Sequence, residues 1–338
     1  MTSRSLSDIQ YEIERYEGTI NLILLCRFFI NDKFKNLKFY PPEESFYTDY
    51  QVEPVAPDFS LLDKKQTLGV VCEVKAGLPQ NEQYLKNVID EKLNRYLNLI
   101  KGWSLDESKF ALIQYTLLFI AHVDNIDKLR AYLIKKNNES QFKKKVSVWE
   151  YQIHSDQYGK GLRFFRIRFY CGESNIKELD NEANIGYSVL GNELDRERGT
   201  CLFTTDPPVE YTIMNLWIFI FSYFAVKRGQ EFKISTDEIN KLIKKQFMRW
   251  GGKKTLLRRS WIVDALKKMV DYKLINKEEE KDSYNVKYEK RNKKDFLDMI
   301  KEKFEKESEE IKEPEFKRKK EVEVKKKQLK LNSNYQEK

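Results

Sequence analysis

One short segment, residues 55–77, constrains the fold of this chain more than any other part of the sequence. Two apolar runs flank a polar turn from Asp63 to Thr67, and this pattern predicts a β-hairpin. Asp58 begins the first predicted strand, while Glu73 and Lys75 lie two residues apart in the second and therefore share one face of the sheet. We expect two carboxylates and one ammonium group at one end of a sheet, which suits a hard divalent cation beside a phosphate.

Four residues of this hairpin, Pro57, Asp58, Glu73 and Lys75, resemble the motif of the PD-(D/E)XK phosphodiesterase superfamily, which has the restriction-endonuclease-like fold. The hairpin context and the apolar lead-in from Leu68 to Cys72 add to the resemblance. It implies an α/β fold with a mixed central sheet flanked by helices. It also implies Mg²⁺ as cofactor, with Mn²⁺ as a substitute. The same residues also allow the alternative of an ordinary hairpin with exposed charges.

The resemblance implies a role for each residue of the motif. Asp58 would be the central metal ligand, and Glu73 the second ligand, helped by the backbone carbonyl of Val74. Lys75 would orient or deprotonate the attacking water, or stabilise the pentacovalent phosphate. Since two carboxylates lie beside Lys75, they should favour its charged form until metal binds, which makes a role as direct general base the weaker of these alternatives.

Many relatives also place a glutamate of the first helix near the metal. Glu17 is the expected residue here, with Glu14 and Glu12 behind it, because Glu17 follows the apolar Tyr16 at the edge of the core face. An ordinary exposed helix acid is the alternative for each of them.

The RecB-like branch of the superfamily carries a Gln-x-x-x-Tyr element on the helix after the hairpin. This chain departs from it: Lys92 replaces the glutamine in the nearest match, Lys92 to Tyr96, and Gln83 is the other candidate. Lys92 and Arg95 could still contact backbone phosphate.

The remaining apolar patterns in the first half of the chain predict an alternation of helices and strands. Residues 8–30, 81–100 and 126–135 have helical spacing, whereas 111–121 is a continuous apolar run typical of a strand buried on both faces, and 146–153 and 163–170 alternate as strands do. Residues 171–210 are polar and contain glycine, and we expect an irregular connection there with a domain boundary near Pro207-Pro208.

The second half of the chain resembles a winged helix-turn-helix domain. An apolar helix at 211–227, a helix from the capping box Ser235–Glu238 to about Phe247, and a third helix from Thr255 to about Tyr272 precede a small β-wing at 274–288. We therefore expect a nuclease-like domain at 1–206, a winged-helix-like DNA-binding domain at 207–291, and a charged helical or disordered tail at 292–338.

Charge supports a polyanionic partner. The net charge is +9 with a pI near 9.0, and residues 227–259 hold eleven Lys and Arg against three acids, a local net charge of +8. Lys253, Lys254, Arg258 and Arg259 gather at the start of the third predicted helix, where a recognition helix meets DNA. A solvated helix face is the alternative.

Other features of the sequence bear on location. The four cysteines are far apart and only two histidines accompany them, so we expect buried or inert thiols in a reducing, cytoplasmic setting and no zinc site. The N-terminus lacks the apolar core of a signal peptide. Residues 216–226 are strongly apolar but only eleven in number, which favours a buried core helix over a membrane span.

The expected function is that of a Mg²⁺-dependent DNA nuclease targeted by a winged-helix module, with endonuclease action favoured over exonuclease action. Restriction-like enzymes commonly act as homodimers, although the sequence holds no dedicated dimer segment. Two alternatives stay open. One is a non-catalytic DNA-binding regulator or a replication or recombination protein on a nuclease-like scaffold, and the other is an RNA nuclease or RNA-binding protein on the same core.

Overall fold

The computed structural model describes residues 6–41, 57–65, 67–76, 89–90, 96, 114–139, 145–155, 163–250, 258–279, 282–300 and 302. Their contacts divide the chain into two compact units, one comprising residues 12–212 and 235–265, the other residues 1–11, 213–234 and 266–338. The three-part division expected from the sequence, with boundaries at 206 and 291, stays a prediction.

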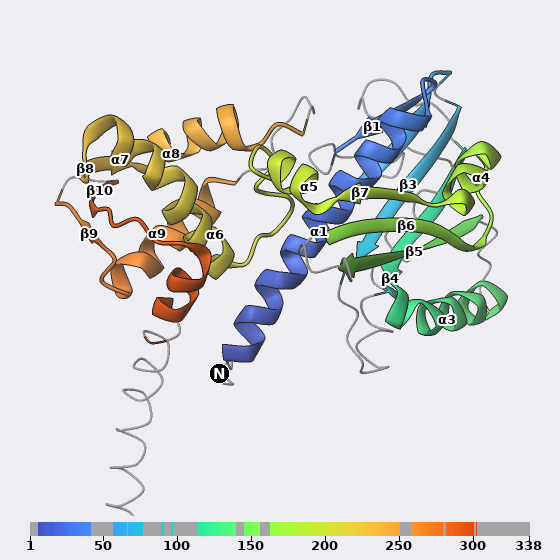
Figure 1. The fold of residues 1–338 in the computed structure, drawn as a ribbon, viewed down its shortest axis with the longest axis horizontal. Helices are drawn as coiled ribbons and strands as arrows, with labels where there is room; N and C mark the ends of the chain where they lie inside the picture. The colour runs from blue at the N-terminus through green and yellow to red at the C-terminus, as the bar shows by residue number, and fades with distance from the viewer. Residues whose placement is uncertain are drawn as a thin grey trace, which may run out of the picture. The chain divides into compact units, whose positions relative to one another are not determined.

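The larger unit is built on a seven-stranded mixed sheet whose strands follow one another in sequence order, β1 to β7 (Figure 1). The strands are β1 (Leu37–Tyr40), β2 (Phe59–Asp63), β3 (Leu68–Lys75), β4 (Gln114–His122), β5 (Val146–Ser155), β6 (Arg163–Gly172) and β7 (Tyr187–Leu190). Only β3–β4 and β4–β5 pair in parallel, and the other neighbours are antiparallel. This confirms the predicted α/β fold with a mixed sheet. The short strand β1 was not predicted.

Helix α1 (Leu6–Lys33) covers one face of this sheet and confirms the helix predicted at 8–30. Its apolar residues recur three or four positions apart, so one stripe of the helix turns inward. The ring of Phe29 packs edge-on against that of Trp149 on β5, with centroids 5.6 Å apart, and Figure 1 shows α1 crossing the strands.

The opposite face of the sheet packs against helix α3 (Ile126–Glu139), which confirms the helix predicted at 126–135. Leu129 and Leu133 of this helix join Leu117 and Phe119 of β4 in one buried cluster. Strand β4 is therefore buried on both faces, as its continuous apolar run predicts. Within the region predicted as a helix at 81–100, the structure describes only residues 89, 90 and 96, and all three are helical.

The prediction of an irregular connection at 171–210 is wrong, because this segment holds helix α4 (Lys177–Ile185), strand β7 and helix α5 (Gly191–Arg198). Neither helix has a side-chain hydrogen bond at its N-cap, so the local start signals are weak. Buried Leu179, Ala183 and Leu194 hold the two helices by tertiary packing instead.

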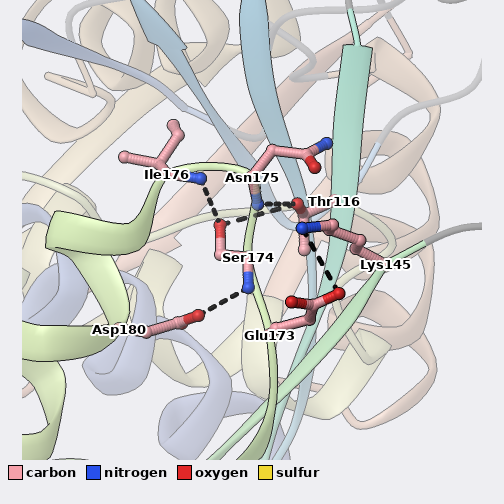
Figure 2. Close-up of polar contacts among 7 residues, drawn as sticks. All are labelled: Thr116, Lys145, Glu173, Ser174, Asn175, Ile176 and Asp180. Carbon is pink, nitrogen blue, oxygen red and sulfur yellow. Dashed lines mark hydrogen bonds and ion pairs between the residues drawn. The ribbon is translucent and has the colours of Figure 1, made fainter.

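A buried polar network fixes the turn between β6 and α4 to the middle of the sheet, as Figure 2 shows. The Thr116 hydroxyl on β4 accepts a 2.8 Å hydrogen bond from the Asn175 backbone N–H, and the Ser174 hydroxyl accepts one of 3.0 Å from that of Ile176. Asp180 accepts hydrogen bonds from the Ser174 N–H and from the Ser147 hydroxyl. These side chains satisfy backbone groups that the turn would otherwise bury without partners.

The smaller unit has an aromatic core. Trp217 packs against Phe221, Tyr288 and Phe296 at centroid distances of 5.9, 5.7 and 6.0 Å, and its indole N–H donates to the Glu289 carbonyl at 2.9 Å. Strands β8 (Glu231–Ser235), β9 (Ile275–Lys277) and β10 (Ser283–Lys287) form a sheet in the order β8-β10-β9, and the antiparallel β9–β10 pair confirms the predicted hairpin. Within the predicted tail, residues 293–300 are helical and Phe296 is buried.

The apolar run of the second half is helical, as predicted. Helix α6 (Val209–Asn215), the π-helical turn η2 (Leu216–Phe221) and helix α7 (Ser222–Arg228) follow one another without a break. Among the described residues this run, Val209–Arg228, is the one helix long and apolar enough to cross a membrane, and 61% of its most apolar window is buried inside the protein. A buried core helix of a soluble protein meets the same two criteria.

The predicted capping box is confirmed. The Ser235 hydroxyl accepts from the Glu238 N–H, and the Glu238 carboxylate accepts in return from the Ser235 N–H at 3.0 Å. Helix α8 (Thr236–Leu242) and a π-helical turn, η3 (Ile243–Phe247), follow. Helix α9 (Arg259–Asp271) matches the third predicted helix, and the part of that prediction before residue 258 lies outside the described residues.

Two glycines with nearly the same positive φ but different surroundings allow a stability test. Gly172 (φ +93°) would direct an added Cβ into the backbone carbonyl of Val146, whereas Gly229 (φ +92°) has open space at that position. Both alanine variants would strain the backbone, and only Gly172→Ala adds a clash. We expect Gly172→Ala to lower the free energy of unfolding by about 3 kcal/mol and Gly229→Ala by about 1 kcal/mol, measured by urea denaturation. Equal losses would show that the close approach to Val146 is wrong.

Candidate active site

The predicted hairpin forms, and its turn sets the pairing of its two strands. The Asp63 carboxylate accepts hydrogen bonds from the backbone N–H groups of Thr67 at 2.7 Å and Leu68 at 2.9 Å. Strands β2 and β3 then pair with Phe59 opposite Cys72. This register brings the residue before Phe59, which is Asp58, beside the last residues of β3.

Asp58 extends the β2–β3 pairing by one residue. Its backbone N–H donates to the Cys72 carbonyl at 3.1 Å, and its carboxylate Oδ2 accepts from the Val74 N–H at 2.7 Å. The carboxylate is therefore held at the end of β3. The residue expected to offer its carbonyl to a metal, Val74, thus also orients Asp58 through its N–H.

Glu73 and Lys75 form a buried ion pair on one face of β3. Glu73 is 1% exposed and Lys75 is 9% exposed, and Lys75 Nζ lies 2.8 Å from Glu73 Oε2. In the sheet they pair with Phe119 and Ala121 of β4. The small side chain of Ala121 leaves Lys75 without a bulky neighbour on that strand. The structure therefore brings together Asp58, Glu73 and Lys75, as the sequence predicts.

Tyr96 is a site residue that sequence analysis noted only as the end of an imperfect motif. Its hydroxyl donates to Glu73 Oε1, so both oxygens of that carboxylate have a donor. Tyr96 is in turn held through its backbone carbonyl, which accepts from the Tyr115 hydroxyl at 2.8 Å. The Lys92–Tyr96 spacing was the available signal, but the missing glutamine obscured it.

Electrostatics keep two donors of this site protonated. Burial by itself lowers the pKa of Lys75, but the carboxylates of Glu73 and Asp58 outweigh it, and the net pKa lies above the ordinary value. Burial, and then the charge of Glu73, raise the pKa of Tyr96 well above its usual range. Lys75 is therefore an ammonium and Tyr96 a neutral phenol at neutral pH, which confirms the expectation that the carboxylates favour the charged form of Lys75.

Helix α1 passes the end of β3 that carries Glu73 and Lys75. A Cβ added at Gly18 would lie 3.3 Å from the Cβ of Ala76, the residue after Lys75. Asp58 is also one of the charges that add to the raised pKa of buried Tyr16, which burial causes first. Glu17, between Tyr16 and Gly18, is half-buried, and its Oε2 lies 3.9 Å from Nη1 of Arg198.

The other two glutamates considered for the site also lie on α1. Glu12 is half-buried and Glu14 is exposed. Among the residues that the structure describes, no three His, Cys, Asp or Glu side chains lie close enough to hold one metal ion together. The roles of Asp58, Glu73 and Glu17 as metal ligands therefore stay predictions.

Two oxygen ligands fit a hard cation of the Mg²⁺ type. Such an ion usually keeps several waters and takes one or two carboxylates, with phosphate oxygens completing its shell. Burial raises the pKa of the Cys72 thiol, which favours the neutral thiol over the thiolate that binds zinc. Cys26, Cys72 and Cys201 are buried free thiols, as expected, and Cys171 is half-buried.

Most of the predicted nucleic-acid contacts fall on residues without a described position. Lys92, Arg95, Lys253 and Lys254 lie outside the described residues. Arg258 is exposed just before α9, and the Arg259 guanidinium lies 3.2 Å from the carboxylate of Asp237 with half of its side chain exposed. Arg259 is thus partly neutralised by an acid of α8.

Comparison of the chain with models of known protein families, with curated proteins and with solved structures found no match.

The Glu73–Lys75 pair predicts a measurable loss of stability. Lys75→Met should lower the free energy of unfolding by about 3 kcal/mol at pH 7, because it leaves a buried carboxylate without its cation. Lys75 has a raised pKa in the folded state, so its contribution is complete below the ordinary lysine value of 10.5 and is lost as pH rises through the folded-state pKa. The difference between wild type and Lys75→Met should therefore shrink at the alkaline end of a urea-denaturation series.

The double variant Glu73→Gln/Lys75→Met is the control for this pair. It removes both charges, so it should be more stable than Lys75→Met alone. A double variant that is less stable than either single variant would contradict the ion pair.

Proposed function

We propose that this protein is a Mg²⁺-dependent phosphodiesterase of the PD-(D/E)XK type that acts on DNA. The observation that carries the proposal is the gathering of Asp58, Glu73 and Lys75 at the end of one hairpin. Buried charged groups are unfavourable for folding unless they are paired, so active sites are where such clusters concentrate. Helix α1, the β2–β3 hairpin, strand β4 and helix α3 follow one another in the order expected for the same superfamily, with the short strand β1 inserted before the hairpin.

Each residue has a role in this proposal. Asp58 and Glu73, with the backbone carbonyl of Val74, would hold the metal ion. When bound, Mg²⁺ neutralises charge on the scissile phosphate and lowers the pKa of the attacking water. Lys75 carries its proton at neutral pH, and it would stabilise the charge that develops on the phosphate as a point cation. Tyr96 would keep Glu73 in place through its hydroxyl.

The C-terminal half supports DNA as the substrate in this proposal. Helices α8 and α9 with the β9–β10 hairpin have the element order of a winged helix-turn-helix, and residues 227–259 carry a local net charge of +8. Arg258 and Arg259 at the start of α9 would contact backbone phosphate. A separate DNA-binding module favours cleavage at internal sites, that is, endonuclease action.

One observation favours a second candidate function. Both oxygens of Glu73 already accept hydrogen bonds, from Lys75 and Tyr96, and Asp58 accepts from Val74. A carboxylate satisfied in this way is also what a scaffold without catalysis would have. The alternative is a DNA-binding regulator or a replication or recombination protein on the same core.

Cleavage of supercoiled plasmid DNA tests the proposal. With Mg²⁺ or Mn²⁺ we expect nicked and linear products, and with EDTA none. Asp58→Asn and Lys75→Ala should each lower the cleavage rate at least about a thousandfold, because each removes several kcal/mol of charge stabilisation.

Two variants outside the site are matched controls. Glu178→Gln and Lys65→Ala remove one exposed charge each and should retain the wild-type rate. Equal activity of Asp58→Asn and Glu178→Gln would sink the proposed site. Binding of DNA without cleavage under either metal would favour the regulator, and cleavage of a matched RNA alone would make the protein a ribonuclease.

A further inference from the structure

A hollow lies in the larger unit and is lined by none of Asp58, Glu73 and Lys75. Its volume is about 440 Å³, and it is lined by residues of α1, of β1, of the β2–β3 turn and by Trp250. A volume of this size is in the range of small-molecule sites, which run from about 300 to 1,000 Å³. None of the metal ligands or nucleic-acid contacts expected from the sequence lines it.

Three cations of different elements face this hollow: Arg27 from α1, Lys38 from β1 and Lys64 from the turn. Among the described residues, no carboxylate forms an ion pair with any of them. Asp63, which precedes Lys64 in the sequence, already accepts from the backbone at Thr67 and Leu68. Glu197 lines an adjoining hollow together with Arg27 and Asn31. Like charges brought together without a counter-charge repel one another, so the site gains free energy when an anion binds.

Two contacts hold the guanidinium of Arg27 in place. Its Nη1 donates to the Arg249 carbonyl at 3.4 Å and lies 3.9 Å from Sγ of the buried Cys201. Those contacts use one nitrogen of a group that has five N–H donors. A fixed guanidinium with remaining donors suits an oxyanion such as phosphate, because less side-chain entropy is lost on binding.

The other walls of the hollow are apolar and aromatic. Leu37 and Phe39 of β1 lie on one side, and Trp250 is fixed by a 2.7 Å hydrogen bond from its indole N–H to the Phe203 carbonyl. Asn31 adds an amide, which can pair with the polar edge of a base. Cations beside flat apolar walls match a phosphate attached to a planar ring system, which is the chemistry of a nucleotide.

The position of the hollow makes it distinct from the candidate active site. It lies at the turn end of the β2–β3 hairpin, where Leu37 pairs with Asp63, whereas Asp58, Glu73 and Lys75 lie at the other end. At a rise of about 3.3 Å per residue, strand β2 separates Asp58 from Asp63 by roughly 16 Å, and from Leu61, which pairs with Phe39 of the hollow, by roughly 10 Å.

We propose that this hollow, which we term the Arg27 pocket, is a second anion-binding site that holds a nucleotide unit through its phosphate. The inference does not depend on the proposed nuclease activity, because it uses none of the residues of that site. Two sources carry the same chemistry: a free nucleotide, and a 5′-phosphorylated end of a single strand.

Calorimetric titration in EDTA tests the pocket without any cleavage. The probes are ADP and a 5′-phosphorylated ten-residue oligothymidylate, each titrated into wild type and into the double variant Lys38→Gln/Lys64→Gln. Both lysines are exposed, so the substitutions should leave the fold intact. The matched control is Lys35→Gln/Lys65→Gln, which removes the same charge from exposed neighbours that do not line the pocket.

We expect at least one probe to lose tenfold or more in affinity in Lys38→Gln/Lys64→Gln and less than twofold in the control. A loss of affinity for ADP identifies a free nucleotide as the ligand. A loss of affinity for the oligonucleotide alone identifies a strand end. Equal losses in both double variants would show only diffuse attraction by surface charge and overturn the pocket, as would the absence of binding by either probe. If the binding data overturn the pocket but the protein still cleaves plasmid DNA, the nuclease proposal stands.

Discussion

The pairing register of β2 with β3 is the constraint on which the candidate active site depends. Side chains alternate between the two faces of a sheet, so a slip of one residue would move Glu73 and Lys75 to the opposite face. The Asp63 carboxylate fixes the turn at one end of the hairpin, and the Asp58 carboxylate accepts from the Val74 N–H at the other. Two aspartates thus lock the same register from both ends.

This register places charged groups in a buried position. Removing a carboxylate and an ammonium group from water is costly, and replacing such a pair by apolar residues often stabilises a protein. The burial of the Glu73–Lys75 pair is therefore weak evidence that the pair stabilises the folded protein. The proposed function rests on a pair that is buried, held by a third residue, Tyr96, and placed at the end of a sheet, where perturbed charged groups often belong to functional sites.

Much of the larger unit could be predicted because its signals are local. The hairpin has alternation and a turn, β4 is a continuous apolar run, and Ser235 and Glu238 form a capping box that the structure contains. The segments that escaped prediction are short and depend on distant partners. Strand β1 has four residues and pairs only with β2, while α4 and α5 lack side-chain caps and form by packing.

The residues of the candidate site likewise fall into those that the sequence could predict and those that only the tertiary fold brings together. Asp58, Glu73 and Lys75 were predictable because two of them share a strand and the third lies across a tight turn. The contact of Tyr96 with Glu73 joins residues 23 positions apart through the tertiary fold, and no sequence periodicity encodes it. The Arg27 pocket collects residues from α1, β1, a turn and Trp250, so only the folded chain brings its three cations together.

A titration with Mn²⁺, followed by electron paramagnetic resonance of the free ion, tests the central claim most directly, because it reports the metal site without needing the right substrate. The account predicts one site in the wild-type protein that is lost or weakened at least tenfold in Asp58→Asn and in Glu73→Gln, and unchanged in Glu178→Gln. Equal Mn²⁺ affinity in all four proteins would contradict the claim that Asp58 and Glu73 form a metal centre.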